Sequence, residues 1–126
     1  MTERSGTRFY PDRAPIDAYG DGGFRFAGMS HRGSLLILPS GIHAWPPAAM
    51  DEIEVDSFAP AFAEQDSIGF LLFGTGEMQV FPSADLRRAF ALHAITLETM
   101  DTGAAVRTYN VLLAERRAVA AALIAI

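Results

Sequence analysis

Two groups of residues in the second half of the chain have the types and spacing that could support chemistry. The first is Gly74-Thr75-Gly76, which directly follows the apolar run 68–73. Glycines after a strand can aim backbone N–H groups at an anion, at the edge where open α/β sheets usually bind ligands. They can equally form a tight turn that needs a positive φ angle. The segment lacks the third glycine of a dinucleotide fingerprint and the lysine of a phosphate loop, so both interpretations stay open.

The second group combines a carboxylate with a guanidinium and an amide. Glu98 ends a predicted strand, and Arg107 and Asn110 are three residues apart on a predicted helix, so they share a face. A Glu–Arg pair near the glycine loop could hold a carboxylate or phosphate group. It could equally be a structural ion pair that fixes the helix to the strand. One functional hypothesis is therefore a small anionic-ligand-binding protein, or a cryptic enzyme, that uses residues 74–76 with Glu98 and Arg107.

Other chemistries find little support in the sequence. Cysteine and lysine are both absent, which excludes thiolate nucleophiles, disulfides, Schiff bases and a phosphate-loop lysine. Ser34 and Ser40 do not lie in a G-x-S-x-G elbow. The three histidines lack ligand spacing, and Glu77, beside the glycine loop, has no visible catalytic partner. We therefore expect no catalytic residue, no metal and no cofactor. The histidines are His31, His43 and His93.

Length and composition indicate one acidic domain. The 126 residues are 50% apolar and carry a formal net charge of -5, which disfavours nucleic acid as a partner because phosphate neutralisation dominates that affinity. No apolar run is long enough to span a bilayer. The polar start contains no secretory h-region, so we expect a cytoplasmic protein. Residues 1–14 are predicted to form a flexible N-terminal arm, and residues 15–126 a single α/β domain.

Hydrophobic patterning predicts the order of elements along that domain. Residues 16–19 and 24–26 alternate as a hairpin, and 30–32 form a polar tip. Further strands are predicted at 34–38, 42–45, 68–73 and 95–98, with a short extended piece at 78–81. A short helix is expected within 57–65, one starting at 82–85 and one from 101–102 to about 117. Residues 119–126 could continue that helix, but a strand is preferred because this apolar run has no polar face.

These elements define the fold class as α/β. We expect a mixed central sheet with helices packed on it and a small extra antiparallel β layer. The run 68–73 is predicted to be the organising strand, covered on both faces because it has no polar alternation.

Several separated motifs in this order resemble a family of small domains of unknown function. The family includes the mitochondrial complex I (NADH:ubiquinone oxidoreductase) assembly factor 3 and an adipogenesis-associated Mth938-type domain protein. The motifs are Gly-Ser-Leu-Leu-Ile-Leu-Pro at 33–39, Trp45, Phe-Gly-Thr-Gly at 73–76, Glu-Thr-Met-Asp-Thr at 98–102, Arg-Thr-Tyr-Asn-Val-Leu at 107–112, Glu115 and Val-Ala-Ala-Ala-Leu at 119–123. The resemblance covers residues 15–126.

The resemblance implies a three-layer domain with a central mixed, mostly parallel five-stranded sheet, helices packed on it and a small extra antiparallel β layer. It also implies a strand at 119–124. It further implies a cleft lined by the motif residues that match here, which are Gly74, Gly76, Thr102, Arg107, Tyr109 and Asn110. It implies no established enzyme activity. The leading hypothesis is therefore a non-enzymatic interaction or assembly module with an unidentified protein partner, such as a respiratory or other membrane complex. A homodimer without any ligand is the third alternative.

Overall fold

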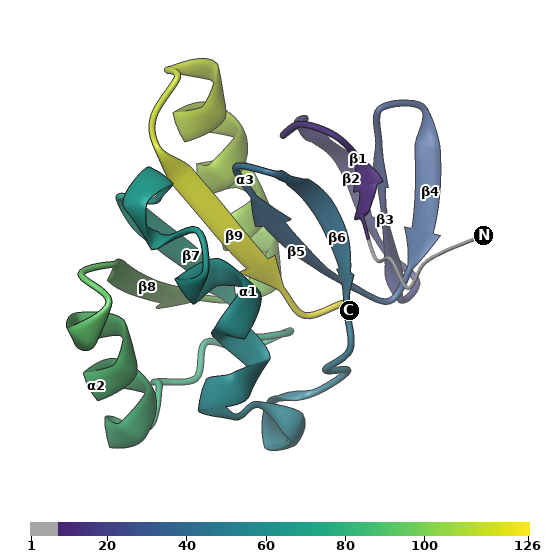
Figure 1. Cartoon of the computed structure of the whole chain (residues 1–126). Helices are drawn as coiled ribbons and strands as arrows, with labels where there is room; N and C mark the ends of the chain where they lie inside the picture. Colours follow the sequence, from purple (N-terminus) through teal and green to yellow (C-terminus); the bar gives the residue numbers. More distant parts are fainter. Residues whose placement is uncertain (1–7) are drawn as a thin grey trace.

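The computed structural model describes residues 8–126, which are arranged in three layers (Figure 1). The strands are β1 (Arg8–Tyr10), β2 (Ile16–Gly20), β3 (Gly23–Phe26), β4 (Met29–Arg32), β5 (Ser34–Leu38), β6 (Gly41–Trp45), β7 (Phe70–Gly74), β8 (Thr96–Met100) and β9 (Val119–Leu123). The helices are α1 (Ala59–Phe62), α2 (Ala84–Leu92) and α3 (Thr102–Ala114), with short 3-10 turns η1 (Met50–Glu52), η2 (Val55–Phe58) and η3 (Gln65–Ser67).

The middle layer is a mixed sheet with the strand order β1-β6-β5-β9-β7-β8. β5 is antiparallel to both β6 and β9, whereas β7 is parallel to both β8 and β9. Of the five predicted strands, only β5 therefore runs against the other four, and the predicted mixed, mostly parallel five-stranded core is confirmed. β1 adds a sixth strand beyond β6. It lies inside the segment predicted as an arm, of which residues 1–7 are outside the described part of the chain.

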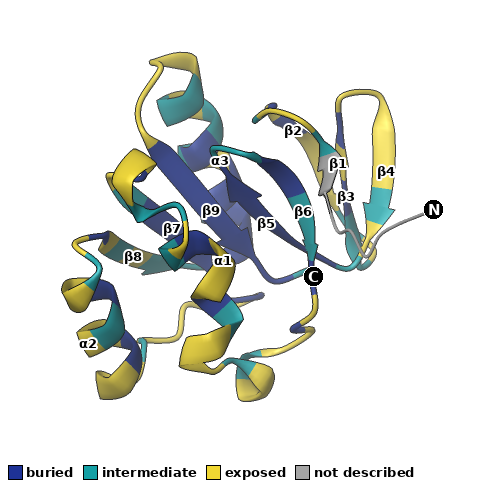
Figure 2. Ribbon diagram, viewed as in Figure 1, coloured by how far each residue is buried: buried dark blue, intermediate teal, exposed yellow. Residues whose placement is uncertain are grey.

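Residues on successive positions of the central strands alternate between two buried faces. On β5, Leu35 and Ile37 belong to one apolar cluster and Leu36 and Leu38 to the other. The alternation follows from the period of two in a strand. Both faces are covered, so each such side chain contributes roughly 1.5–3 kcal/mol of burial. Figure 2 shows β5, β7 and β9 as the most continuously buried strands, which confirms the prediction of an organising strand covered on both sides.

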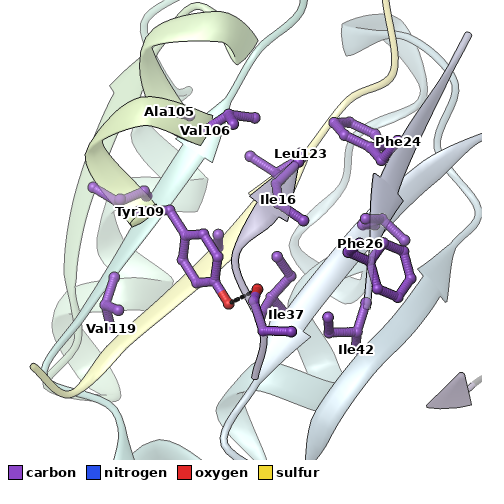
Figure 3. Close-up of a cluster of buried hydrophobic side chains, with 14 residues drawn as sticks. Ile16, Phe24, Phe26, Ile37, Ile42, Ala105, Val106, Tyr109, Val119 and Leu123 are labelled. Carbon is purple, nitrogen blue, oxygen red and sulfur yellow. Dashed lines mark hydrogen bonds between the residues drawn. The ribbon is translucent and has the colours of Figure 1, made fainter. Parts of the chain in front are cut away.

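One face is covered by α3 together with the small antiparallel sheet β2-β3-β4, which is the predicted extra layer. Its third strand, β4, pairs with β3 and includes residues 30–32, which the sequence indicated as a polar tip. None of the β4 side chains is fully buried, so this strand carries no hydrophobic pattern. Figure 3 shows this cluster, with Phe24 and Phe26 of β3 facing Ile37 and Ile42 of the central sheet.

The opposite face is covered by α1, α2 and the turns before them. Its aromatic centre is Phe58, whose ring lies 5.2 Å from both Trp45 and Phe73 and 5.1 Å from Phe90, in edge-to-face geometry. The two helix-bearing faces are thus independent surfaces, with α3 on one side of the sheet and α2 on the other (Figure 1).

Local signals explain where the helices begin and end. Ser83 Oγ accepts the Leu86 N–H, and Asp101 Oδ1 accepts the Ala104 N–H, so both helices are capped and start within the predicted ranges 82–85 and 101–102. α3 ends at Ala114, earlier than the predicted residue 117, because Arg116 adopts φ 60°, the left-handed conformation that closes helices. The following residues form β9, as preferred in the sequence analysis.

Candidate functional site

The Gly74-Thr75-Gly76 segment is turned into the protein, where all three residues are buried. The Thr75 N–H donates to the Met100 carbonyl at 2.9 Å, and the Gly76 N–H donates to Thr102 Oγ1 at 3.0 Å. These two N–H groups are already bonded within the chain, so the anion-binding interpretation of the loop gains no support. Gly76 has φ 113°, which matches the alternative prediction of a turn that needs glycine.

Thr102 connects this loop to α3 and to the end of β9. Its fully buried hydroxyl donates to the Ile124 carbonyl at 2.7 Å while it accepts the Gly76 N–H. A Cβ atom at Gly74 would lie 2.9 Å from the Thr102 Cα and 3.0 Å from its Oγ1. Glycine is therefore required at position 74 because the first turn of α3 approaches the strand closely. Three residues predicted to line a cleft, Gly74, Gly76 and Thr102, thus pack directly against one another, and we call this contact the packed joint.

Tyr109 and Asn110 attach α3 to the start of the small sheet. The Tyr109 hydroxyl donates to the Ala14 carbonyl at 2.8 Å (Figure 3), and burial raises the pKa of this hydroxyl above its ordinary range. The Asn110 side chain accepts the Ile16 N–H at 2.8 Å and donates to the Ile16 carbonyl at 2.9 Å. Asn110 thereby supplies β2 with the pair of hydrogen bonds that a neighbouring strand would provide.

Glu98 and Arg107, the proposed ion pair, are not joined by any contact within residues 8–126. Glu98 is exposed on β8 and borders a hollow of about 390 Å³ with Thr108 and Arg117. Arg107 is exposed on α3, where its Nη1 donates to the Tyr19 hydroxyl of β2 at 3.2 Å. The structure therefore does not assemble these residues with the glycine loop into one cleft.

Three exposed apolar side chains lie close together in the segment that follows the glycine loop. Phe81 and Met78 are 79% and 75% exposed, and Val80 is 40% exposed. Val80 and Phe81 also border a hollow of about 380 Å³, which Val55 of η2 lines from the other side. We call residues 78–81 the apolar loop. Apolar side chains gathered around a hollow in this way are typical of contact surfaces.

Hydrogen bonds fix the apolar loop on the domain. Thr75 Oγ1 donates to the Met78 carbonyl at 2.6 Å and accepts the Val80 N–H at 3.0 Å. The Gln79 side chain donates to the Thr99 carbonyl of β8 at 3.0 Å. The residues predicted as a short extended piece at 78–81 belong to no strand. Thr75, predicted to bind a ligand, instead holds the loop that displays Met78 and Phe81.

A cluster of Ser40, His43 and Glu64 resembles catalytic chemistry only in composition. Ser40 Oγ lies 2.9 Å from His43 Nε2 and 2.5 Å from Glu64 Oε2, and Glu64 also accepts the Ser40 N–H. In a hydrolytic triad the carboxylate orients the histidine, whereas here it contacts the serine. Glu64 thus holds the turn between β5 and β6. Among the described residues no group of three or more histidine, aspartate or glutamate side chains could hold a metal ion.

The chain is similar in structure to small α/β domains of solved structure. A crystal structure of an outer membrane protein from Bartonella henselae matches with a TM-score of 0.87 and 49% identity, covering 93% of this chain and 98% of that one. A solution structure of a Mth938-like domain from Bordetella pertussis matches with a TM-score of 0.78 and 27% identity, covering 89% and 85%. In the described residues, no helix has the length and hydrophobicity needed to cross a membrane.

Residues 16–124 match the family described as protein of unknown function DUF498/DUF598, and the chain belongs to this family. An uncharacterized protein of Rhodobacter capsulatus is 41% identical over 110 residues, which are 87% of this chain and 83% of the relative. The zebrafish (Danio rerio) NADH dehydrogenase (ubiquinone) 1 alpha subcomplex assembly factor 3 is 31% identical over 109 residues. That match covers 86% of this chain and 63% of the assembly factor. The predicted family resemblance is thereby confirmed.

The motifs and hydrophobic periodicity of the sequence did not identify the apolar loop as a candidate surface. Its signal was present: Met78, Val80 and Phe81 stand between a buried glycine turn and Pro82, outside any helical or sheet periodicity. Apolar residues in such a loop follow no helical or strand periodicity that would place them in the core. Their presence there therefore indicates a contact surface.

Proposed function

We propose that this protein is a cytoplasmic, non-enzymatic interaction module that assists the assembly of a respiratory or other membrane protein complex. The relatives support an assembly role, since they include assembly factors of NADH dehydrogenase. The chain spans 63% of the zebrafish assembly factor. The observation that carries the proposal is the fixed apolar loop, with Phe81 79% exposed beside a hollow.

The fixed conformation of the loop favours binding to a protein partner. A free loop loses backbone conformational entropy when it is immobilised in an interface, at roughly 1–2 kcal/mol for each residue whose backbone is fixed. Here the hydroxyl of Thr75 and the side chain of Gln79 already hold the backbone that carries Met78 and Phe81. Exposed aromatic and methionine side chains are enriched in the centres of protein interfaces.

The experiment is affinity purification of the tagged full chain from its native host, followed by mass spectrometry. We expect subunits of a membrane-bound complex to be recovered with the wild-type chain and lost with Phe81→Ser combined with Met78→Ser. The matched control is Val111→Ser, which removes another exposed apolar side chain, 57% exposed, from α3 on the opposite face of the sheet. Failure of the wild-type chain to recover any membrane-complex subunit would contradict the proposal.

A further inference from the structure

A second groove lies next to the apolar loop and has a different chemical character. It has a volume of about 460 Å³, and its apolar wall includes Trp45, Pro46, Pro47 and Pro60. Trp45 is held in place by its indole N–H, which donates to the Ser57 carbonyl at 2.8 Å, and by edge-to-face packing on Phe58. Trp45 is only 4% exposed, so the surface of this wall is presented mainly by the exposed rings of Pro46 and Pro60, which lose no side-chain rotamer freedom on binding.

The polar side of this groove is acidic: the carboxylates outnumber the one histidine, His43 of β6. Glu52, Glu54 and Asp56 line it, and no arginine does. The three carboxylates are exposed. They are positioned by the turns η1 and η2, where Glu54 and Ser57 form a reciprocal capping box and Glu52 accepts the Ala48 N–H at 3.0 Å. An apolar wall facing a fixed acidic rim selects a ligand that is both apolar and cationic.

We infer that this groove, which we call the acidic groove, receives a positively charged peptide segment of the partner protein, with arginine or lysine side chains on the carboxylates and apolar side chains on the exposed proline rings. The inference rests on the proposed function and specifies the chemistry of the partner. The acidic groove is continuous with the proposed contact surface, because Glu54 also lines the hollow bordered by Val55 and Phe81.

Charge argues against the other macromolecular occupants. Nucleic acids and anionic lipid surfaces would meet like charge at Glu52, Glu54 and Asp56, in a chain whose formal net charge is -5. A cationic segment is attracted by both the local rim and the overall charge. The volume of the groove falls within the range of roughly 300–1,000 Å³ that is usual for binding pockets.

The test uses the full chain and two synthetic decapeptides, one alternating arginine with leucine and one alternating glutamate with leucine. Trp45 is the single tryptophan and lines the acidic groove with a side chain that is 4% exposed, so its fluorescence responds to a charge bound beside the ring. The arginine–leucine peptide is expected to change the Trp45 emission saturably, with an affinity that falls as salt rises, and the glutamate–leucine peptide is expected to leave it unchanged. An unchanged emission with both peptides would overturn the inference.

Charge variants locate the binding. Glu52→Gln combined with Asp56→Asn is expected to weaken binding of the arginine–leucine peptide by roughly 3–10-fold, as for two partly exposed ion pairs. Glu98→Gln combined with Asp66→Asn removes the same charge elsewhere and is expected to leave affinity within about 2-fold, since distant exposed charges are screened. Equal weakening in both double variants would overturn the inference, because binding would then follow net charge alone.

Two further observations on the free protein would overturn the inference by showing another occupant. Nuclear Overhauser contacts from residues 1–7 to Trp45 would assign the groove to the chain's own start. A concentration-dependent change of Trp45 emission without peptide would assign it to a second copy.

Affinity purification separates this inference from the proposed function. If wild-type chain and the Glu52→Gln/Asp56→Asn variant recover the same complex subunits in equal amount, the inference about the acidic groove fails while the proposed function stands. If the wild-type chain recovers no such subunit but binds the peptide as described, the proposed function fails and the acidic groove stands.

Discussion

Replacing Thr102 by valine tests whether the Gly74–Gly76 region is a structural joint. The Thr102 side chain is fully buried, and its hydroxyl satisfies the Gly76 N–H and the Ile124 carbonyl. Valine has nearly the same shape but leaves both backbone groups without that partner. Each buried polar group left unsatisfied costs about 1–3 kcal/mol, so the free energy of unfolding should fall by roughly 2–5 kcal/mol.

The assay is equilibrium unfolding in urea, followed by Trp45 fluorescence and by far-ultraviolet circular dichroism. The transition midpoint should move to lower urea with an unchanged slope. Thr102→Ser is the matched control: it keeps the hydroxyl, removes one methyl group and should cost about 1 kcal/mol. If Thr102→Val lies within about 0.5 kcal/mol of the wild type, or if serine costs as much as valine, the hydrogen-bonded joint does not have the role argued here.

Three further changes follow from the same structure. Gly74→Ala should reduce the free energy of unfolding by roughly 1–3 kcal/mol in urea, because the added Cβ would lie 2.9 Å from the Thr102 Cα. Ala94→Gly should raise the thermal midpoint and stabilise by about 0.5–1 kcal/mol, since Ala94 holds a φ angle of 58° in the turn that ends α2. Burial raises the pKa of the Tyr109 hydroxyl above its ordinary value of 10.0, so its contribution is complete below that pH and is lost as the pH rises through and beyond it. Wild-type chain should therefore lose more stability between about pH 8 and pH 11 than Tyr109→Phe, and equal losses would contradict this assignment.

The elements of the central sheet could be predicted from sequence because burial on both faces leaves an unbroken apolar run. The strands at 34–38, 68–73 and 119–126 were found in this way; β5 has the predicted bounds, whereas β7 and β9 differ from them by one to three residues at one or both ends. β4 and β1 were not found. β4 is polar and mostly exposed, and β1 is an edge strand of three residues. Neither strand therefore has a hydrophobic periodicity long enough to be recognised in the sequence.

The candidate site was less predictable because its residues act through tertiary contacts. Gly74 is required by the approach of Thr102, which is distant in sequence, and no local pattern reports that approach. Gly74, Gly76 and Thr102, which all belong to the family motifs, are in contact in the structure, but spacing alone does not distinguish a packed joint from a ligand cleft. Arg107 shares a helix with Thr102, yet its guanidinium meets Tyr19 of the small sheet.

The apolar loop illustrates how a structural joint can serve a functional surface. Thr75 is buried within the joint, and its hydroxyl fixes the backbone of Met78 and Val80. Thr75→Val should therefore loosen the loop and weaken partner binding without removing any contact side chain. This connection explains why residues that line no ligand cleft can still be important for the proposed assembly role.

The central claim is that the apolar loop contacts the partner, and site-specific photocrosslinking in the native host tests it most directly. A benzophenone amino acid would replace Phe81 in one full-length chain and Val111, on the opposite face, in another. We predict that the probe at position 81 crosslinks a subunit of a membrane-bound complex and that the probe at position 111 does not. Crosslinking of that subunit at position 111 alone, or at neither position from a chain that still co-purifies with it, would contradict the account.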